Sequence, residues 1–285
     1  MIIDTRKNIL IVGLGLIGGC YAKGLKRLNF KVSAIDTNSN SIKYALDNNI
    51  IDSGSTKLDE KLIGSADLVV FCLYPDTFRN WIKDNQHLLK SGCLITDVTG
   101  VKKSIVYEIQ SMLRQDIEFV PAHPMAGREV YGVENSDERI FYNANFVITP
   151  TDKNTPEAID VIKEFGLLLG FKNIRVISPE KHDEVIGFVS QLTHCIAISL
   201  MTCDDKEDLQ DFTGDSFRDL TRIARINEDM WSKLFVENKE ELVNQIDLFT
   251  SELNKLRNMI KDEDIDSMKK LMIKSTNKRK LFDKE

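Results

Sequence analysis

The most constraining feature of the sequence is a glycine-rich segment, Gly13-Leu14-Gly15-Leu16-Ile17-Gly18. A short apolar run at 8–12 precedes it, a helical pattern follows it, and a second strand-like run at 31–35 ends at Asp36. The spacing GxGxxG alone is a weak signal. A strand before it, a helix after it and an acidic residue beyond the next strand are the context of a dinucleotide-binding βαβ unit. We therefore predict that this segment forms such a unit.

The three glycines of this segment have separate predicted roles. Gly13 permits the tight turn, Gly15 lets the backbone approach a pyrophosphate at the helix N-terminus, and Gly18 allows the helix to pack closely on the strand. Asp36 is expected to bind the ribose hydroxyls of adenosine and to repel a 2′-phosphate, which favours NAD over NADP. The alternative, a glycine-rich turn without a ligand, explains fewer of these features. The predicted cofactor-binding residues are Gly13, Leu14, Gly15, Leu16, Ile17, Gly18, Asp36 and Leu73.

Strand-like runs and helical patterns continue to alternate after this unit. The strand-like runs are 66–73, 93–97, 117–121, 146–150 and 173–178, and the helical patterns are 76–89, 102–113 and 156–170. This alternation predicts an α/β fold, a doubly wound Rossmann domain with a parallel sheet over residues 1–178. Ligands bind such sheets at the carboxyl ends of the strands, which makes Thr99 a candidate substrate contact. A turn or helix-capping role explains Thr99 equally well.

A histidine lies between two prolines in the segment Pro121-Ala122-His123-Pro124. Proline fixes φ at about −65° and cannot donate to a strand ladder, so we predict that the strand ends here and that His123 lies on a stiff loop. A histidine at the carboxyl end of a strand is suited to act as an acid or base near neutral pH. The alternative is a histidine that only caps a carbonyl. The long polar segment 127–142 follows, and its position beside the predicted site is typical of a functional loop.

The pattern after residue 178 is helical only, which predicts a separate all-helical domain over residues 179–285. The segment 181–201 is apolar almost all round and is predicted to be a buried central helix, although Gln191 and His194 lie within it. Buried polar side chains need partners or a ligand, so His194 is a candidate substrate contact. A core histidine with its hydrogen bonds satisfied is the commoner case. His182 lies about 120° round the helix from His194, so we expect no metal site.

Two further patterns occur in the helical region. Arg218, Arg222 and Arg225 fall on one face of a predicted helix, and we expect one of them to point inward and grip a carboxylate while the others are solvated. Apolar residues between 231 and 260 follow mostly 4,3 spacing, which predicts a long helix packed on another helix. We expect that partner helix to belong to a second subunit, in a homodimer formed through the C-terminal helices. The basic segment after Ile273 is expected to fray.

Charge and cysteine content limit the partners and the compartment. The net charge is −6, from 38 basic and 44 acidic residues, which argues against nucleic acid as a partner. Five cysteines without a CxxC motif indicate buried free thiols in a reducing compartment. Residues 1–7 lack the layout of a signal peptide, and the longest apolar run, 185–201, is short for a membrane span. We therefore expect a cytoplasmic protein that binds neither membrane nor nucleic acid.

Several segments match the motifs of one dehydrogenase family in order and in spacing. They are Gly13–Gly18 with Asp36, Asp97–Lys102, His123–Gly127, His182-Asp183, Ser190–His194, Phe217–Ala224 and Met230-Trp231. Over nearly its whole length, the chain resembles a prephenate dehydrogenase. The resemblance implies NAD-dependent oxidative decarboxylation of prephenate to 4-hydroxyphenylpyruvate, a step of tyrosine biosynthesis.

The same resemblance implies roles for individual residues. His123 is the catalytic base that takes the proton of the ring hydroxyl. His194 and Arg222 contact the dianionic substrate, Trp231 lies near the site, and Glu129 guards its entrance. In this picture the small-molecule partner is prephenate.

Two positions depart from the family pattern. Gly100 stands where the family often has a serine that helps to orient the catalytic histidine, and Thr99 beside it is the candidate substitute. Gln191 stands where the family often has a histidine. We expect neither a fused chorismate mutase nor a C-terminal ACT domain in this chain, so any feedback by tyrosine acts at the site itself.

Three other functions compete with this interpretation. An arogenate dehydrogenase acts on a substrate with an amino group in place of the side-chain keto group, and no residue in the sequence distinguishes the two. The β-hydroxyacid and imine-type dehydrogenases typically use a lysine base on the central helix, and the centre of 181–201 has none. A non-catalytic NAD(H)-binding redox sensor calls for a DNA-reading module or a basic face, which the net charge of −6 does not suggest.

Overall fold

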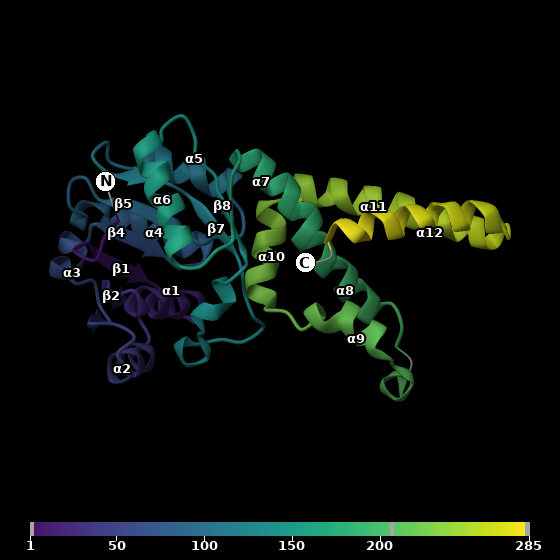
Figure 1. Ribbon diagram of the computed structural model, residues 1–285, viewed down its shortest axis with the longest axis horizontal. Coiled ribbons are helices and arrows are strands. Elements are labelled where there is room, and N and C mark those ends of the chain that lie inside the picture. Colours follow the sequence, from purple (N-terminus) through teal and green to yellow (C-terminus); the bar gives the residue numbers. More distant parts are fainter. Residues whose placement is uncertain (1–2, 206–207, 283–285) are drawn as a thin grey trace.

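The computed structural model describes residues 3–205 and 208–282, and in it a parallel α/β unit is followed by a helical region (Figure 1). A six-stranded parallel sheet has the order β3-β2-β1-β4-β5-β6. Its strands are β1 Asn8–Val12, β2 Lys31–Ile35, β3 Ser53–Ser55, β4 Leu68–Phe71, β5 Leu94–Asp97 and β6 Glu118–Phe119. This is the predicted doubly wound fold. The short β3 has no apolar side chain, which explains why hydrophobic patterning does not reveal it.

Helices cover both faces of this sheet, as expected for parallel strands that are buried on both sides. They are α1 Leu16–Arg27, α2 Ser39–Asp47, α3 Glu60–Ser65, α4 Pro75–Asn85, α5 Lys103–Met112 and α6 Pro156–Leu168, with a 3₁₀ turn at Gln86–Leu88. Alternate side chains of β1 enter different cores: Ile9 and Ile11 pack in one cluster, and Leu10 and Val12 in the other. The sheet therefore presents the turn after β1 on a rigid support.

A second, three-stranded sheet carries the histidine between the prolines, so the predicted loop at His123 is wrong. Its strands are β7 Ala122–Met125, β8 Asn145–Ile148 and β9 Asn173–Val176, with β7 antiparallel to β8 and β8 parallel to β9. The strand before the prolines does end, since β6 stops at Phe119, but a new strand begins at Ala122 and Pro124 pairs in register with Phe146. Because β7 is an edge strand, the missing N–H of proline is tolerated. His123 therefore lies on a strand, not on a loop.

The predicted polar loop 127–142 is partly ordered by two 3₁₀ turns, Val133–Asn135 and Glu138–Phe141. Val133 and Phe141 are fully buried against the core beside α1. The amine of Lys23 on α1 also donates to the carbonyl of Ser136. This part of the segment is consequently anchored to the nucleotide-binding unit.

The helical region starts with α7 Pro179–Ile186, continues through a π-helical turn, Gly187–Gln191, into α8 Leu192–Thr202, and contains further short and long helices. These are α9 Asp215–Thr221, α10 Glu228–Glu237, α11 Lys239–Lys261 and α12 Ile265–Arg279, with 3₁₀ turns at Leu209–Phe212, Arg222–Ala224 and Lys280–Phe282. In α8 only Leu192 and Ala197 are buried, so the predicted buried central helix is wrong for the single chain. Pro179–Thr202 is also long and apolar enough to cross a membrane, and 28% of its most apolar stretch is buried. This helical segment is longer than the apolar run 185–201 that the sequence indicated.

The predicted long helix over 231–260 is interrupted at Asn238, where α10 ends and α11 begins. In Figure 1, α11 and α12 lie side by side and extend away from the α/β unit. The segment after Ile273 remains helical to Arg279 and ends in a 3₁₀ turn, so the predicted fraying is wrong for residues 274–282, while residues 283–285 lie outside the described residues. The apolar side chains that this hairpin exposes are Val243, Leu248, Phe249, Leu253, Ile260, Ile265, Met272 and Ile273.

The five cysteines are all unpaired, as the odd count and spacing predicted. Cys20 and Cys93 are buried, Cys72 and Cys195 are partly exposed, and Cys203 is exposed. The expectation of buried thiols is therefore correct for two of them only, because the region around Cys195 and Cys203 is less covered than its apolar sequence suggests.

Candidate active site

The glycine loop has the geometry that close backbone approach requires. Gly13 has φ +96°, and a side chain there would overlap the carbonyl of Cys72. A side chain at Gly18 would overlap the carbonyl of Gly13, whereas one at Gly15 would meet no atom within 4 Å. Two glycines are thus required by packing. The third leaves open space beside the loop.

The residues around the loop fit a bound dinucleotide. The first turn of α1 has no acidic residue and its N-cap, Gly15, makes no side-chain hydrogen bond, so its amides are available to an anion. The carboxylate of Asp36 accepts hydrogen bonds from the backbone amides of Leu14, at 2.5 Å, and Asn38, at 2.7 Å. Leu73 lies within 3.0 Å of the position that a Gly13 side chain would occupy. The loop, Asp36 and Leu73 therefore lie next to one another.

His123 is paired with a second histidine from the helical region. Its Nδ1 lies 2.9 Å from Nε2 of His182 on α7, and Nδ1 of His182 lies 2.7 Å from Oδ1 of Asp183. His182 and Asp183 are buried, and His123 is partly exposed. In the sequence, His182-Asp183 matches a family motif and His182 is excluded as part of a metal pair with His194, but this contact was not predicted. The adjacent His182-Asp183 pair was the available signal.

The ionisation of both histidines is shifted by these surroundings. Burial, with a smaller effect of the neighbouring His182 and Lys102, holds the pKa of His123 well below its ordinary value. Burial also lowers the pKa of His182, although the Asp183 carboxylate opposes this shift. The neutral imidazole is therefore the stable form of His123 near pH 7. A neutral imidazole can accept a proton.

A buried ion pair lies behind β7. The amine of Lys102, which is fully buried, donates to both carboxylate oxygens of Asp97, at 2.8 and 2.7 Å, and to the carbonyl of Ala122 at 2.6 Å. The hydroxyl of Thr99 also bonds to Asp97, and its backbone amide donates to the same carboxylate. Thr99 thus makes the contacts of the turn role considered for it. The network joins β5 to the residue before His123.

Gly100 leaves space beside the imidazole. A side chain there would begin 3.9 Å from Cε1 of His123 and 3.7 Å from Cδ1 of Leu234, which are ordinary van der Waals separations. The absent serine is therefore not excluded by crowding. Leu234 belongs to α10, so this helix closes on the His123 side of the α/β unit.

A second cluster lies on the helical region. The ring of His194 stacks on Trp231 with centroids 3.7 Å apart, and its Nδ1 donates to the carbonyl of Ser190 at 2.9 Å. Burial lowers the pKa of His194, while the Ser190 carbonyl and the nearby Glu129 carboxylate oppose that shift. Arg222 forms an ion pair with Glu129 at 2.5 Å. The structure thus brings together four residues predicted to surround the substrate.

The arginine prediction is only partly correct. Helix α9 ends at Thr221 and Arg222 begins a 3₁₀ turn, so Arg218, Arg222 and Arg225 do not share one continuous helical face. All three are exposed, and none points inward. Arg218 pairs with Asp215, whereas Arg222 reaches Glu129 across the two regions.

Helix α10 is held in place by buried amides and by an ion pair. Gln191 donates to the carbonyl of Leu234 at 3.0 Å, and Asn238 donates to the Gln191 side chain at 2.7 Å and to the Asp183 carbonyl at 2.9 Å. Arg79 on α4 makes a two-pronged contact with Glu237, at 2.7 and 2.9 Å. Gln191, which differs from the family pattern, therefore has a structural partner. These contacts fix Trp231 and Leu234 relative to His123.

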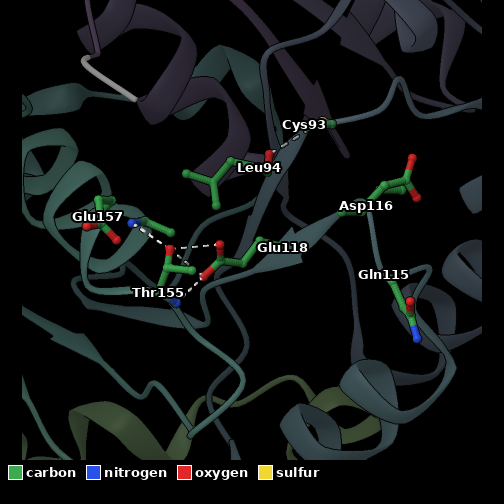
Figure 2. Close-up of a pocket in the computed structure, with 10 residues that line it drawn as sticks. Cys93, Leu94, Gln115, Asp116, Glu118, Thr155 and Glu157 are labelled. Atoms are coloured by element: carbon green, nitrogen blue, oxygen red, sulfur yellow. Dashed lines mark hydrogen bonds between the residues drawn. The ribbon is translucent and has the colours of Figure 1, made fainter.

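Figure 2 shows a different cavity, of about 240 Å³, between the amino ends of β5 and β6 and the start of α6. Glu118 accepts a hydrogen bond there from the backbone amide of Thr155 at 2.6 Å. Its lining includes none of the predicted site residues. Over residues 3–205 and 208–282, no group of three or more histidine, cysteine or acidic side chains is placed to hold a metal ion.

A nucleotide-binding βαβ turn, with a neutral histidine on a neighbouring strand and a helical region that closes over it, defines a two-domain nucleotide-dependent dehydrogenase. A family model described as prephenate dehydrogenase, nucleotide-binding domain, matches residues 21–175. A second, described as prephenate dehydrogenase, dimerization domain, matches residues 178–274. The chain belongs to the prephenate dehydrogenase family.

Individual relatives agree with this assignment. A prephenate dehydrogenase of Bacillus subtilis is 29% identical over 93% of this chain and 73% of its own length. A cyclohexadienyl dehydrogenase of Zymomonas mobilis is 30% identical over 91% of this chain and 90% of its own. The crystal structure of prephenate dehydrogenase from A. aeolicus in complex with hydroxyphenyl propionate and NAD⁺ aligns with a TM-score of 0.89. It is 33% identical and covers 97% of this chain and 98% of that one. The chain is therefore an oxidoreductase of the prephenate and arogenate dehydrogenase type.

Proposed function

We propose that this protein catalyses the NAD-dependent oxidative decarboxylation of prephenate to 4-hydroxyphenylpyruvate. The observation that carries the proposal is the neutral, partly exposed imidazole of His123, whose Nδ1 faces His182 and whose Nε2 is left as the proton acceptor. The solved relative with hydroxyphenyl propionate and NAD⁺ supports the same ligand classes. Asp36, close to the glycine loop, supports NAD over NADP.

The proposed chemistry divides between the cofactor and this chain. NAD⁺, held by the Gly13–Gly18 loop and Asp36, supplies the hydride acceptor for C4 of the ring. His123 takes the proton of the 4-hydroxyl at Nε2 and returns it to the ring oxygen after CO₂ has left, so that the product keeps its hydroxyl. The ring carboxylate departs as CO₂, and aromatisation of the ring drives the reaction. General-base catalysis of this kind contributes about 10²–10⁴-fold to the rate.

The helical region is proposed to hold the anionic end of the substrate. Arg222 carries the charge for a carboxylate, and His194, stacked on Trp231, adds a hydrogen-bonding ring nitrogen. In this structure the guanidinium of Arg222 is already paired with the Glu129 carboxylate. A substrate carboxylate therefore has to displace Glu129, which makes Glu129 the group at the entrance.

Two assays test the function. Replacement of His123 by Asn is expected to lower kcat for prephenate-dependent NADH formation by at least about 10²-fold. An unchanged kcat would show that His123 is not the base. Turnover of prephenate and arogenate, each with NAD⁺ and NADP⁺, tests the substrate. We expect the highest kcat/KM with prephenate and NAD⁺. A higher value with arogenate would make the protein an arogenate dehydrogenase.

We also propose a homodimer formed by the helical region, with residues 1–178 and 179–285 as the two domains and the cytoplasm as the compartment. The apolar side chains exposed on Pro179–Thr202, α11 and α12 support this arrangement, because large exposed apolar surface often marks an interface. A second copy then covers the apolar segment Pro179–Thr202 instead of a membrane. Light scattering of the detergent-free protein is expected to give twice the chain mass of 32.5 kDa. A monomer in solution would contradict the proposal.

A further inference from the structure

We propose that His182 and Asp183 are positioning residues that fix the tautomer and orientation of His123. The inference rests on the proposed role of His123 as the base, but it concerns different residues and a different step. Neither residue is expected to touch substrate, since both are buried behind the His123 ring.

The hydrogen-bond order follows from the chemistry of the three groups. Asp183 Oδ1, as a carboxylate oxygen, accepts the proton on Nδ1 of His182, 2.7 Å away. Nε2 of neutral His182 then carries a lone pair and accepts the proton on Nδ1 of His123, 2.9 Å away. The lone pair of His123 is consequently on Nε2. This is the tautomer that a base acting from Nε2 requires.

Asp183 is itself held firmly. Its Oδ1 accepts from the backbone amide of Lys102 at 2.8 Å, and its Oδ2 accepts from that of Lys103 at 2.9 Å. These two amides begin α5, which has no side-chain cap of its own. The N-terminus of a helix favours a negative charge, so α5 stabilises the Asp183 carboxylate. The pair thereby links the helical region to the α/β unit at the catalytic histidine.

The position of Gly100 explains why this chain depends on the pair. Gly100 lies beside the imidazole, with its Cβ position 3.9 Å from Cε1 of His123, but glycine has no side chain that could hydrogen-bond the ring. Thr99, the other candidate, uses its hydroxyl on Asp97. Within residues 3–205 and 208–282, His182 is the hydrogen-bond partner of the His123 ring. Orientation of the imidazole therefore comes from His182.

The pair also affects the charge that His123 acquires when it takes the proton. The charged groups near the imidazole are Lys102, Asp97 and Asp183. Lys102 and Asp97 neutralise each other in their ion pair, which leaves the Asp183 carboxylate, one histidine away, to stabilise the imidazolium. Loss of the pair therefore weakens both the orientation of the base and its protonated form.

Two substitutions of His182 separate these effects from simple loss of structure. Phe retains the ring shape without nitrogen atoms, and Gln can accept from His123 with its carbonyl oxygen while its amide donates to Asp183. We expect His182→Phe to lower kcat by about 10²-fold with KM for prephenate and NAD⁺ changed by less than about threefold. His182→Gln is expected to restore most of this loss. His87→Phe is the matched control, because His87 is exposed on the 3₁₀ turn after α4.

The tautomer is measured directly by ¹⁵N NMR of the histidine-labelled protein, whose chain has only four histidines. The wild type is expected to show His123 protonated at Nδ1 and unprotonated at Nε2, and His182→Phe a mixture of both tautomers. A wild-type His123 protonated at Nε2 would overturn the proposal, even if His182→Phe does not fold. Unchanged kcat and tautomer in folded His182→Phe would also overturn it. Loss of activity in His123→Asn, with full activity in His182→Phe, would reject this inference while retaining the proposed function.

Discussion

Replacement of Gly100 by serine tests whether the site has room for a side chain beside His123. The added Cβ would meet three side-chain atoms at 3.7, 3.8 and 3.9 Å, two from Leu234 and one from His123. Contacts at these separations contribute about 0.1–0.2 kcal/mol each. Loss of glycine flexibility in the unfolded chain adds about 0.4–1 kcal/mol where the backbone suits other residues. The φ of Gly100 is not positive, so its backbone is compatible with other residues.

The sum is a stabilisation of roughly 1 kcal/mol, which corresponds to a rise in Tm of roughly 2–4 °C. Thermal unfolding of Gly100→Ala and Gly100→Ser measures this rise, and both variants are expected to show it. A difference in kcat between the two then isolates the hydroxyl. If Gly100→Ser lowers Tm by several degrees, the space beside His123 is not as described, and the reasoning is refuted.

Three shorter predictions concern pH and ligand binding. Because burial lowers the pKa values of His123 and His182, the unfolded state binds more protons than the native state below pH 6.5. As the pH falls below 6.5, the free energy of unfolding is therefore expected to decrease by up to about 1.4 kcal/mol per pH unit for each histidine. A Tm that stays constant from pH 8 to pH 5.5 would contradict this. Glu129→Gln is expected to lower KM for prephenate by up to about fivefold with unchanged Tm, since it frees Arg222 from an exposed ion pair contributing about 0–1 kcal/mol. An increased KM would argue against competition between Glu129 and the substrate carboxylate for Arg222. Gly15→Ala is expected to raise KM for NAD⁺ about tenfold without changing Tm, because the new methyl group enters open space at the loop; an unchanged KM would place the pyrophosphate elsewhere.

The contacts between the α/β unit and the helical region explain how the site is assembled. Asp183 caps α5, Arg79 binds Glu237, and Gln191 and Asn238 join α7 to α10. Each contact pairs groups that are partly or fully buried, where an unpaired partner carries a cost of about 1–3 kcal/mol. The orientation of α10, and with it Trp231, thus depends on polar contacts that are specific in direction.

Local sequence determined the nucleotide-binding part of this protein. The glycine spacing, the apolar runs and Asp36 lie within a few tens of residues of one another, and their roles depend on backbone geometry that neighbouring residues decide. The same reasoning predicted the end of β6 but missed β7, because the local effect of Pro121 and Pro124 suggested a loop after the strand end. Pairing with β8, far along the chain, outweighed it, since an edge strand does not need the missing N–H.

Tertiary structure alone decided which groups meet at the site. His123 and His182 are 59 residues apart, Glu129 and Arg222 are 93 apart, and no periodicity connects either pair. The exposure of α8 and the break at Asn238 likewise depend on what packs beside each helix. Short-range pattern specifies the loop that binds a nucleotide, because backbone conformation is local. The partners that tune a base are specified by the fold, because hydrogen bonds and charges act between residues that only folding brings together.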